Sequence, residues 1–195
     1  SPTPPTPTPI PQLDTLNYMG AFNMTATYEA NEGFCSAKII VITTIPFQVT
    51  LKRVEDGHLS GEATAKASWN GEWRVSPSSG ECRVKSGEIS RGSVSGNAEV
   101  KITASWDQKA PEQVTLRVCE SCYAGGSDTL SGGEVRPIIR SQTIFVYAFY
   151  DCSSRNSCKT FPFLGGTVTF NGEDSVLKSK YSGTGIATLI SQTQR

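Results

Sequence analysis

The sequence predicts an all-β protein, an antiparallel sandwich or barrel of about nine to eleven strands that follows an extended Pro/Thr-rich arm. Apolar and polar residues alternate with period two over long segments, as in half-buried strands. Turn-forming residues recur about every ten residues, and no segment carries the 3.6-residue periodicity of an amphipathic helix. A chain of 195 residues can bury a core without disulfide support. We therefore expect residues 15–195 to form one domain.

Residues 1–14 are predicted to form an extended arm or tether. Its first eleven residues, SPTPPTPTPIP, alternate proline with threonine or serine, which favours polyproline II and cannot form a core. About ten such residues span roughly 30 Å. Arms of this kind join exported domains to an anchor or a partner, so Pro4, Pro5, Pro7 and Pro9 are candidate partner-binding residues. A lipid anchor on a cysteine immediately before Ser1 would be consistent with this arrangement.

The clearest strands lie in the middle of the chain. In residues 59–68, Leu59, Gly61, Ala63, Ala65 and Ala67 share one face, and in residues 97–106, Ala98, Val100, Ile102, Ala104 and Trp106 do the same. Residues 22–30, 47–54, 113–119 and 166–172 show similar alternation. The alanine-rich inner faces leave volume that aromatic side chains or a ligand must fill, because protein interiors are close-packed.

The segment SWNGEW predicts a hairpin. A two-residue Asn70-Gly71 loop would place Arg74 opposite Ala67 on the apolar face, and a buried charge without a partner is unfavourable. We therefore expect a three-residue loop at 69–71 that pairs Ala67 with Trp73. Trp73 then belongs to the core, and Trp69 lies at the exposed tip, where it is a candidate for binding a partner or a sugar.

The segment SQTIFVYAFY, residues 141–150, differs from the others because both of its faces are apolar. Phe145, Tyr147 and Phe149 share one face, and we expect a central strand that is covered on both sides. The alternative is an aromatic patch that binds a partner through these three residues.

Six cysteines allow 15 disulfide pairings: Cys35, Cys82, Cys119, Cys122, Cys152 and Cys158. If strands 113–119 and 138–150 form a hairpin, Cys119 and Cys122 lie at its loop end and Cys152 at the far end. Twelve strand residues span about 40 Å, too far for a disulfide or for a shared zinc ion. This favours Cys119 with Cys122 and Cys152 with Cys158, which leaves Cys35 with Cys82.

Redox chemistry at CESC, residues 119–122, is not favoured. Reactive thiols in such motifs usually cap a helix, whereas here a strand precedes the motif and Ala-Gly-Gly-Ser follows it. We expect structural disulfides and an oxidising, extracytoplasmic compartment. The glycosylation sequon at Asn23 agrees with this location if the source is eukaryotic.

The segment GGSDTLSGG, residues 125–133, resembles one turn of the calcium-binding nonapeptide repeat of RTX proteins. The resemblance covers Asp128, Leu130 and the flanking glycine pairs, and one residue is missing before Asp128. In that family calcium lies between stacked turns, and this chain has one. We expect a flexible glycine loop and no metal, with Asp128 as the ligand if calcium binds.

Catalysis has little support in the sequence. His58 is the only histidine and lies in the turn segment Glu55-Asp56-Gly57-His58. No nucleophile elbow, phosphate loop or histidine-rich metal set is present, so we expect no enzyme activity and no cofactor. A carboxylate pair of the glycosidase type needs no sequence motif and stays open.

Composition excludes nucleic acid as a partner, because acidic and basic residues balance at 18 each and basic residues supply most of that affinity. The leading interpretation is a non-catalytic, secreted or cell-surface β-domain that acts as an accessory or structural subunit of a membrane-associated assembly. It would bind a protein partner, or a second copy of itself. The alternative is a ligand-binding β-barrel or a carbohydrate-binding module.

Overall fold

The computed structural model describes residues 12–32, 34–137, 159–174 and 179–195, with the backbone alone for residues 32, 119–128 and 174. Residues 1–11 of the predicted arm, called the Pro/Thr arm from here on, and the segment 141–150 lie outside the described residues. So do the partner-binding candidates in them: Pro4, Pro5, Pro7, Pro9, Phe145, Tyr147 and Phe149. Leu13 and Asp14, which the prediction of residues 1–14 included in the arm, lie in the first strand, Leu13–Glu32. The prediction of an all-β fold is confirmed, and no helix occurs among the described residues.

The described residues form eight antiparallel strands in one sheet. They are β1 (Leu13–Glu32), β2 (Cys35–Glu55), β3 (His58–Pro77), β4 (Ser90–Asp107), β5 (Gln113–Gly132), β6 (Lys159–Pro162), β7 (Gly165–Asp174) and β8 (Ser179–Gln194). Their order across the sheet is β6-β5-β4-β3-β2-β1-β8-β7. The last strand, β8, is therefore inserted between β1 and β7.

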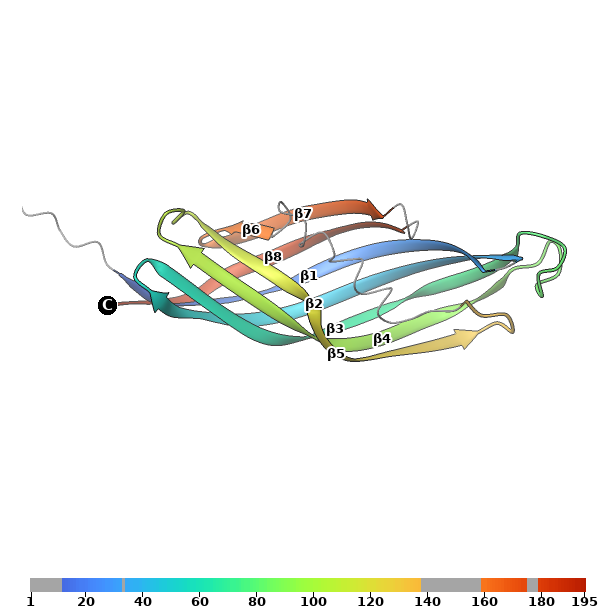
Figure 1. Ribbon diagram of the computed structural model, residues 1–195, viewed down its shortest axis with the longest axis horizontal. Helices are drawn as coiled ribbons and strands as arrows, with labels where there is room; N and C mark the ends of the chain where they lie inside the picture. Colours follow the sequence, from blue (N-terminus) through green and yellow to red (C-terminus); the bar gives the residue numbers. More distant parts are fainter. Residues whose placement is uncertain (1–11, 33, 138–158, 175–178) are drawn as a thin grey trace, which may run out of the picture.

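The sheet curls into an elongated, nearly closed barrel whose long strands run along the long axis of the molecule (Figure 1). The two edge strands, β6 and β7, are consecutive in the chain and lie next to each other. The short turn between them closes the barrel at this corner, while the hydrogen-bonded ladder runs the other way round, through the other six strands.

Alternate residues of every strand point into the barrel, as period-two patterning requires. The predicted inner faces are confirmed, because Ala65, Ala67, Ala98, Val100, Ile102, Ala104 and Trp106 are all buried. Aromatic side chains from the other strands fill the volume left by these small residues. Phe22 stacks on Phe47 at 5.3 Å between ring centroids and meets Phe161 edge-on at 6.2 Å. The interior is thus a packed core along much of its length.

The predicted hairpin at 69–71 is wrong, because β3 runs without a break from His58 to Pro77. Trp69 lies opposite Thr43 of β2 and Gly96 of β4 and is only 2% exposed, so it is a core residue and not an exposed tip. Gly71 serves a close approach: a Cβ there would meet the carbonyl oxygen of Ile40 at 1.9 Å. Trp73 is buried, as predicted, in the same alternation.

The predicted glycine-rich loop after Cys119 is also wrong, because β5 continues to Gly132 and pairs with Gly92–Asn97 of β4. Asp128 lies in this strand, opposite Gly96. The extra length is absorbed by a bulge: Glu99 pairs with Ala124 and Lys101 with Cys119, so residues 120–123 lie opposite Val100 alone. No helix follows Cys122, as predicted.

The strand pairing assumed for the cysteine argument does not hold at Gln113–Leu116, because this part of β5 pairs with β6 on the edge that β4 leaves open. Residues 138–150 and Cys152 lie outside the described residues, so the predicted separation between Cys152 and the CESC motif stays a prediction. The predicted Cys35–Cys82 bond is present, whereas the side chains of the other four cysteines lie outside the described residues.

Candidate functional site

A recess of about 450 Å³ opens at the end of the barrel where β1 begins and β8 ends. In an up-and-down meander every second turn lies at the same end, so segments far apart in the sequence meet here. The lining residues are Gln12, Leu13, Gly57, Trp106, Gln108, Pro111, Phe163, Gln192 and Gln194. We call this feature the end recess.

Hydrogen bonds between neighbouring turns hold the end recess in shape. The backbone N–H of Gln108 donates to the carbonyl oxygen of Gly57 at 2.7 Å. Gly57 has a φ of +79°, a left-handed conformation that glycine adopts without strain. The indole N–H of Trp106 donates to the carbonyl oxygen of Pro111 at 3.2 Å. The β2–β3 and β4–β5 turns are thus fixed together on one side of the recess.

The other side of the end recess is held by the β6–β7 turn. The backbone N–H of Phe163 donates to the carbonyl oxygen of Glu112 at 2.8 Å. The carbonyl oxygen of Phe163 accepts a 2.7 Å hydrogen bond from the hydroxyl of Tyr18. Tyr18 is fully buried, and this burial raises the pKa of its phenol well above its usual value of 10.0. The hydroxyl therefore stays protonated and keeps donating to the turn.

The described lining of the end recess is uncharged. Arg53 lies beside the recess, where its guanidinium donates to Gln12 Oε1 at 2.9 Å and to the carbonyl oxygen of Leu13 at 2.7 Å. Asp14 and Asp56 each lie 3.6 Å from it, and the Arg53 side chain is 15% exposed. The arginine thus fixes the start of β1 and is not free to bind a ligand.

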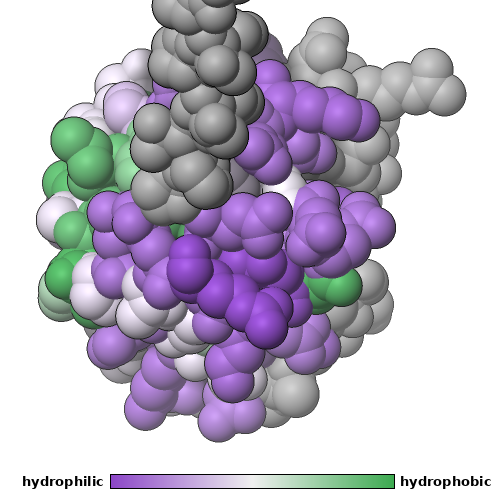
Figure 2. All heavy atoms as spheres, turned by 90° about the vertical axis from the view of Figure 1, so that its left-hand side faces the viewer, coloured by the Kyte–Doolittle hydropathy of each residue, from purple (hydrophilic) through white to green (hydrophobic). Residues whose placement is uncertain are grey.

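The end recess combines an apolar floor with a rim of amides. The rings of Trp106 and Phe163 meet at 6.3 Å between centroids, and Leu13 and Pro111 extend this surface. Four glutamine side chains form the rim. Figure 2 shows this end of the molecule, where hydrophilic residues dominate the visible surface. Such a lining suits a neutral ligand that offers hydrogen-bonding groups and some apolar surface.

His58 lies near the same end. Its Nδ1 is 4.0 Å from Asp107 Oδ2, and both side chains are partly exposed. The sequence predicts a solvated turn histidine, and the structure places it at the first position of β3, opposite Asp107. Among the described residues, no serine, threonine or cysteine side chain hydrogen-bonds to His58, as a nucleophile would to its base.

The outer surface of the barrel is divided into two kinds of wall. The outward residues of β3, β4 and β5 include many charges, and several of them pair, such as Lys101 with Glu62 at 3.2 Å and Arg74 with Glu72 at 3.9 Å. The outward residues of β1, β2 and β8 are uncharged over most of their length. They are Thr15, Asn17, Met19, Ala21, Asn23, Thr25, Thr27, Ile40, Ile42, Thr44, Pro46, Gln48, Thr50, Ser182, Thr184, Ile186, Thr188 and Ile190. We call this surface the uncharged wall.

Exposed apolar side chains gather on the uncharged wall. Of the nine large hydrophobic residues that are exposed in the described part of the chain, five belong to it: Met19, Ile40, Ile42, Ile186 and Ile190. Polar side chains between them bond to each other, as Asn17 does to Ser191 at 2.7 Å and Thr44 to Asn23 at 3.1 Å. The ion pairs Lys38–Glu29 and Lys180–Glu173 lie toward the far end of the same strands.

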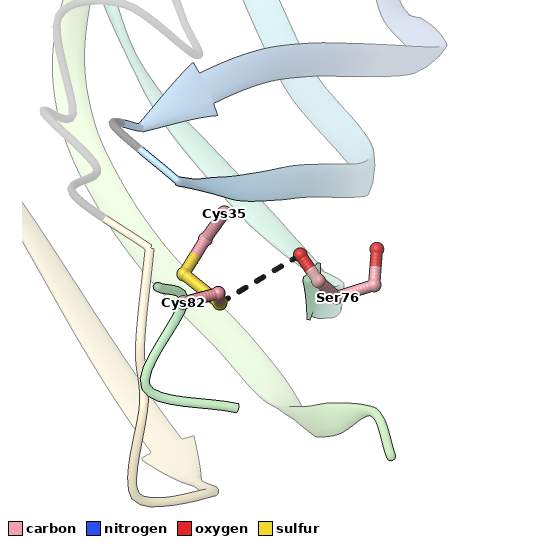
Figure 3. The surroundings of a disulfide bond; sticks show 3 residues. All are labelled: Cys35, Ser76 and Cys82. Atoms are coloured by element: carbon pink, nitrogen blue, oxygen red, sulfur yellow. Dashed lines mark hydrogen bonds between the residues drawn. A yellow bond between two sulfur atoms is a disulfide. The ribbon is translucent and has the colours of Figure 1, made fainter. Parts of the chain in front are cut away.

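The Cys35–Cys82 disulfide lies at the opposite end of the barrel from the end recess. It ties the loop after β3 to the first residue of β2, with the Cα atoms 5.1 Å apart. Figure 3 shows Cys82 Sγ directed toward the carbonyl oxygen of Ser76, at 4.0 Å. A disulfide sulfur carries no proton, so this is a packing contact. The bond agrees with an oxidising compartment.

Sequence reasoning placed the candidate site elsewhere. Trp69, the one predicted partner-binding residue with a described side chain, is buried, and neither the end recess nor the uncharged wall was expected. The recess residues lie in turns, where no periodicity identifies them. The wall has a readable signal, since the outward positions of 15–27 and 40–50 alternate with core residues and carry no charge.

No family model, curated protein or solved structure matches this chain. Within the described residues, no helix is long and apolar enough to cross a membrane, and no group of three or more His, Cys, Asp or Glu residues could hold a metal ion.

Proposed function

We propose that the protein is a non-catalytic, extracytoplasmic β-domain that serves as an accessory or structural subunit of a larger assembly at a membrane or cell surface. The uncharged wall is the observation that carries this proposal. Charged residues are depleted at the cores of protein interfaces because their desolvation is costly. Five exposed apolar side chains gather on this wall, and only Ile40, at its border with β3, lies opposite a charged residue, Glu72. Such a surface is typical of one that a partner covers.

The polar groups of the uncharged wall support the same proposal. Thr15 bonds to Thr193 at 2.6 Å and Asn17 to Ser191 at 2.7 Å, so part of the polar surface is already satisfied within the protein. A partner that covers these groups displaces less water from unsatisfied donors and acceptors, which lowers the cost of docking. The barrel itself acts as a rigid support, since aromatic packing fills its core.

The test is a pull-down of membrane and cell-surface proteins with the full chain, an Ile42→Lys/Ile186→Lys variant and a Thr129→Lys control. Both isoleucines are exposed on the uncharged wall, and Thr129 is exposed on β5, outside that wall. We expect one set of partners to bind the full chain and the control and to be lost from the double variant. Equal recovery by all three, with unchanged melting temperatures, would refute this role for the wall.

The second candidate, a ligand-binding barrel or carbohydrate-binding module, finds support only in the end recess. An interior ligand of the lipocalin type would need space that Trp73, Tyr18, Phe22 and Phe161 occupy. The amide rim and aromatic floor of the recess suit a neutral ligand, and titration with soluble oligosaccharides tests that reading.

A further inference from the structure

We infer that the end recess binds the Pro/Thr arm, residues 1–11, of a second copy of this chain, and that two copies exchange arms in a closed dimer. The two copies associate at the end of the barrel, and this contact is independent of the proposed docking of a different protein on the uncharged wall.

The chemistry of the end recess matches the arm. Six of the first eleven residues are proline, and no side chain among them is charged. Such a segment offers carbonyl acceptors and flat pyrrolidine rings but few backbone donors. The recess offers complementary groups: glutamine amides at the rim that can donate to these carbonyls, and an apolar floor at Trp106, Pro111 and Phe163 for the rings. Aromatic floors with nearby donors are the usual way in which proteins bind polyproline II segments.

The position of the arm explains why the occupant comes from a second copy. Gln12 directly follows the arm and also lines the end recess. Its carbonyl oxygen accepts from the backbone N–H of Arg195 at 2.9 Å, and its side chain accepts from Arg53 at 2.9 Å. To enter its own recess, the arm would have to reverse within Pro9-Ile10-Pro11, where two prolines restrict the backbone.

The location of the chain ends makes the exchange reciprocal. The start of β1 and the end of β8 lie at one end of the barrel (Figure 1). The end recess lies at the same end, because Leu13 and Gln194 line it. Two copies that meet end to end through a two-fold axis each present an arm to the recess of the other, and such an arrangement closes as a dimer. Eleven residues of polyproline II span roughly 34 Å, enough to cross from one copy into the next.

The first experiment compares the oligomeric state of the full chain and a 12–195 variant by sedimentation velocity. The deletion removes no part of the described sheet, which begins at Leu13, and its melting curve checks the fold. We expect the full chain to be a dimer and the 12–195 variant a monomer that binds a synthetic SPTPPTPTPIP peptide. A monomeric full chain, or a dimer that persists in the 12–195 variant, overturns the exchange.

Point variants then test the recess itself. Gln108→Ala/Gln192→Ala removes two exposed rim amides, and Gln48→Ala removes an exposed amide from the uncharged wall as the matched control. We expect the double variant to weaken the dimer by roughly tenfold or more, as for the loss of two hydrogen bonds, and Gln48→Ala to leave it unchanged. An equal effect of both, or none from the double variant, contradicts the inference.

Mixing tests whether the arm of one copy binds the recess of another. A full chain with Gln108→Ala/Gln192→Ala keeps its arm, and the 12–195 variant keeps its recess, so the two together should form a mixed dimer more tightly than either self-associates. Absence of a mixed dimer refutes the exchange. The oligomeric state of the unmodified full chain separates exchange from binding of each arm in its own recess. If the 12–195 variant bound neutral oligosaccharides and not the peptide, the recess would be a sugar-binding site and the exchange would be refuted. Ile42→Lys/Ile186→Lys should leave the dimer intact, which separates this test from that of the wall.

Discussion

At the scale of single residues, the Cys35–Cys82 bond links positions that are 47 residues apart in the chain. Cross-links over loops of this size restrict the unfolded chain and usually stabilise a protein by about 2–4 kcal/mol. We expect Cys35→Ser/Cys82→Ser to lower the free energy of unfolding by about that amount, as measured by urea denaturation. Ser78→Ala, in the same loop, serves as a control and should change it little. An unchanged midpoint in the double variant would contradict the disulfide.

Tyr18 connects the buried core to the end recess by a hydrogen bond. Its hydroxyl donates to Phe163, whose ring forms part of the recess floor. Tyr18→Phe removes one buried hydrogen bond and leaves a carbonyl oxygen unsatisfied, so we expect a loss of about 1–2 kcal/mol in stability. Urea denaturation measures this loss, and equal stability of Tyr18→Phe and the parent chain would contradict the hydrogen bond.

The pH dependence of stability gives a second, independent test of Tyr18. The unfolded chain releases the tyrosine proton near pH 10.0, whereas burial raises the pKa in the folded protein well above this value. Above about pH 10 the unfolded state therefore binds fewer protons, and stability falls by about 1.4 kcal/mol per pH unit. We expect Tyr18→Phe to lack this component between pH 10 and 11, in unfolding curves recorded against the parent chain. Identical slopes for both proteins would show that Tyr18 is not buried.

At the scale of strands, β4 passes close to its neighbour at Gly92. A Cβ there would meet the carbonyl oxygen of Ser131 at 1.9 Å and the ring of Trp73 at 2.6 Å. Because Trp73 is fully buried and its indole donates to Ser93, the ring cannot move away freely. We expect Gly92→Ala to destabilise the protein by about 1–3 kcal/mol or more in thermal denaturation. Gly80→Ala, which meets nothing within 4 Å, should be close to neutral.

The two strand errors in the sequence prediction have the same cause. Asn70-Gly71 and the glycines at 125–133 favour turns locally, yet both segments lie within strands. Glycine indicates either a turn or a place where backbones approach, and Gly71, against Ile40, is the second kind. The alternation from Leu59 to Val75 already continued through Gly71 without a change of face, and it was the better guide.

At the scale of the whole molecule, the class of fold follows from period two, but the end recess does not. Its shape depends on which strands are neighbours, and β8 pairs with β1 across almost the full length of the chain. No local sequence pattern around Gln12 or Gln192 predicts that β1 pairs with β8. The recess floor depends in addition on the β6–β7 turn, which brings Phe163 against Trp106.

The pairing of β1 with β8 has a consequence for the chain ends. Leu13 lies opposite Gln194, and the backbone N–H of Arg195 donates to Gln12, so the two ends of the described sheet are adjacent. We expect a circular permutant to fold in which a short Gly/Ser linker joins Arg195 to Gln12 and new ends lie between Gly87 and Glu88. That site is an exposed loop between β3 and β4, where a break removes no strand pairing.

The permutant should keep the far-ultraviolet spectrum of the 12–195 chain and melt within about 4 °C of it, the shift that corresponds to about 1 kcal/mol in a domain of this size. A second permutant opened between Thr64 and Ala65, within the paired part of β3, should fail to fold, because the break interrupts the ladder with β4. If the Gly87 permutant failed as well, the two chain ends would not lie side by side as the β1–β8 ladder places them. Folding of both would instead mean that β3 does not need to be continuous.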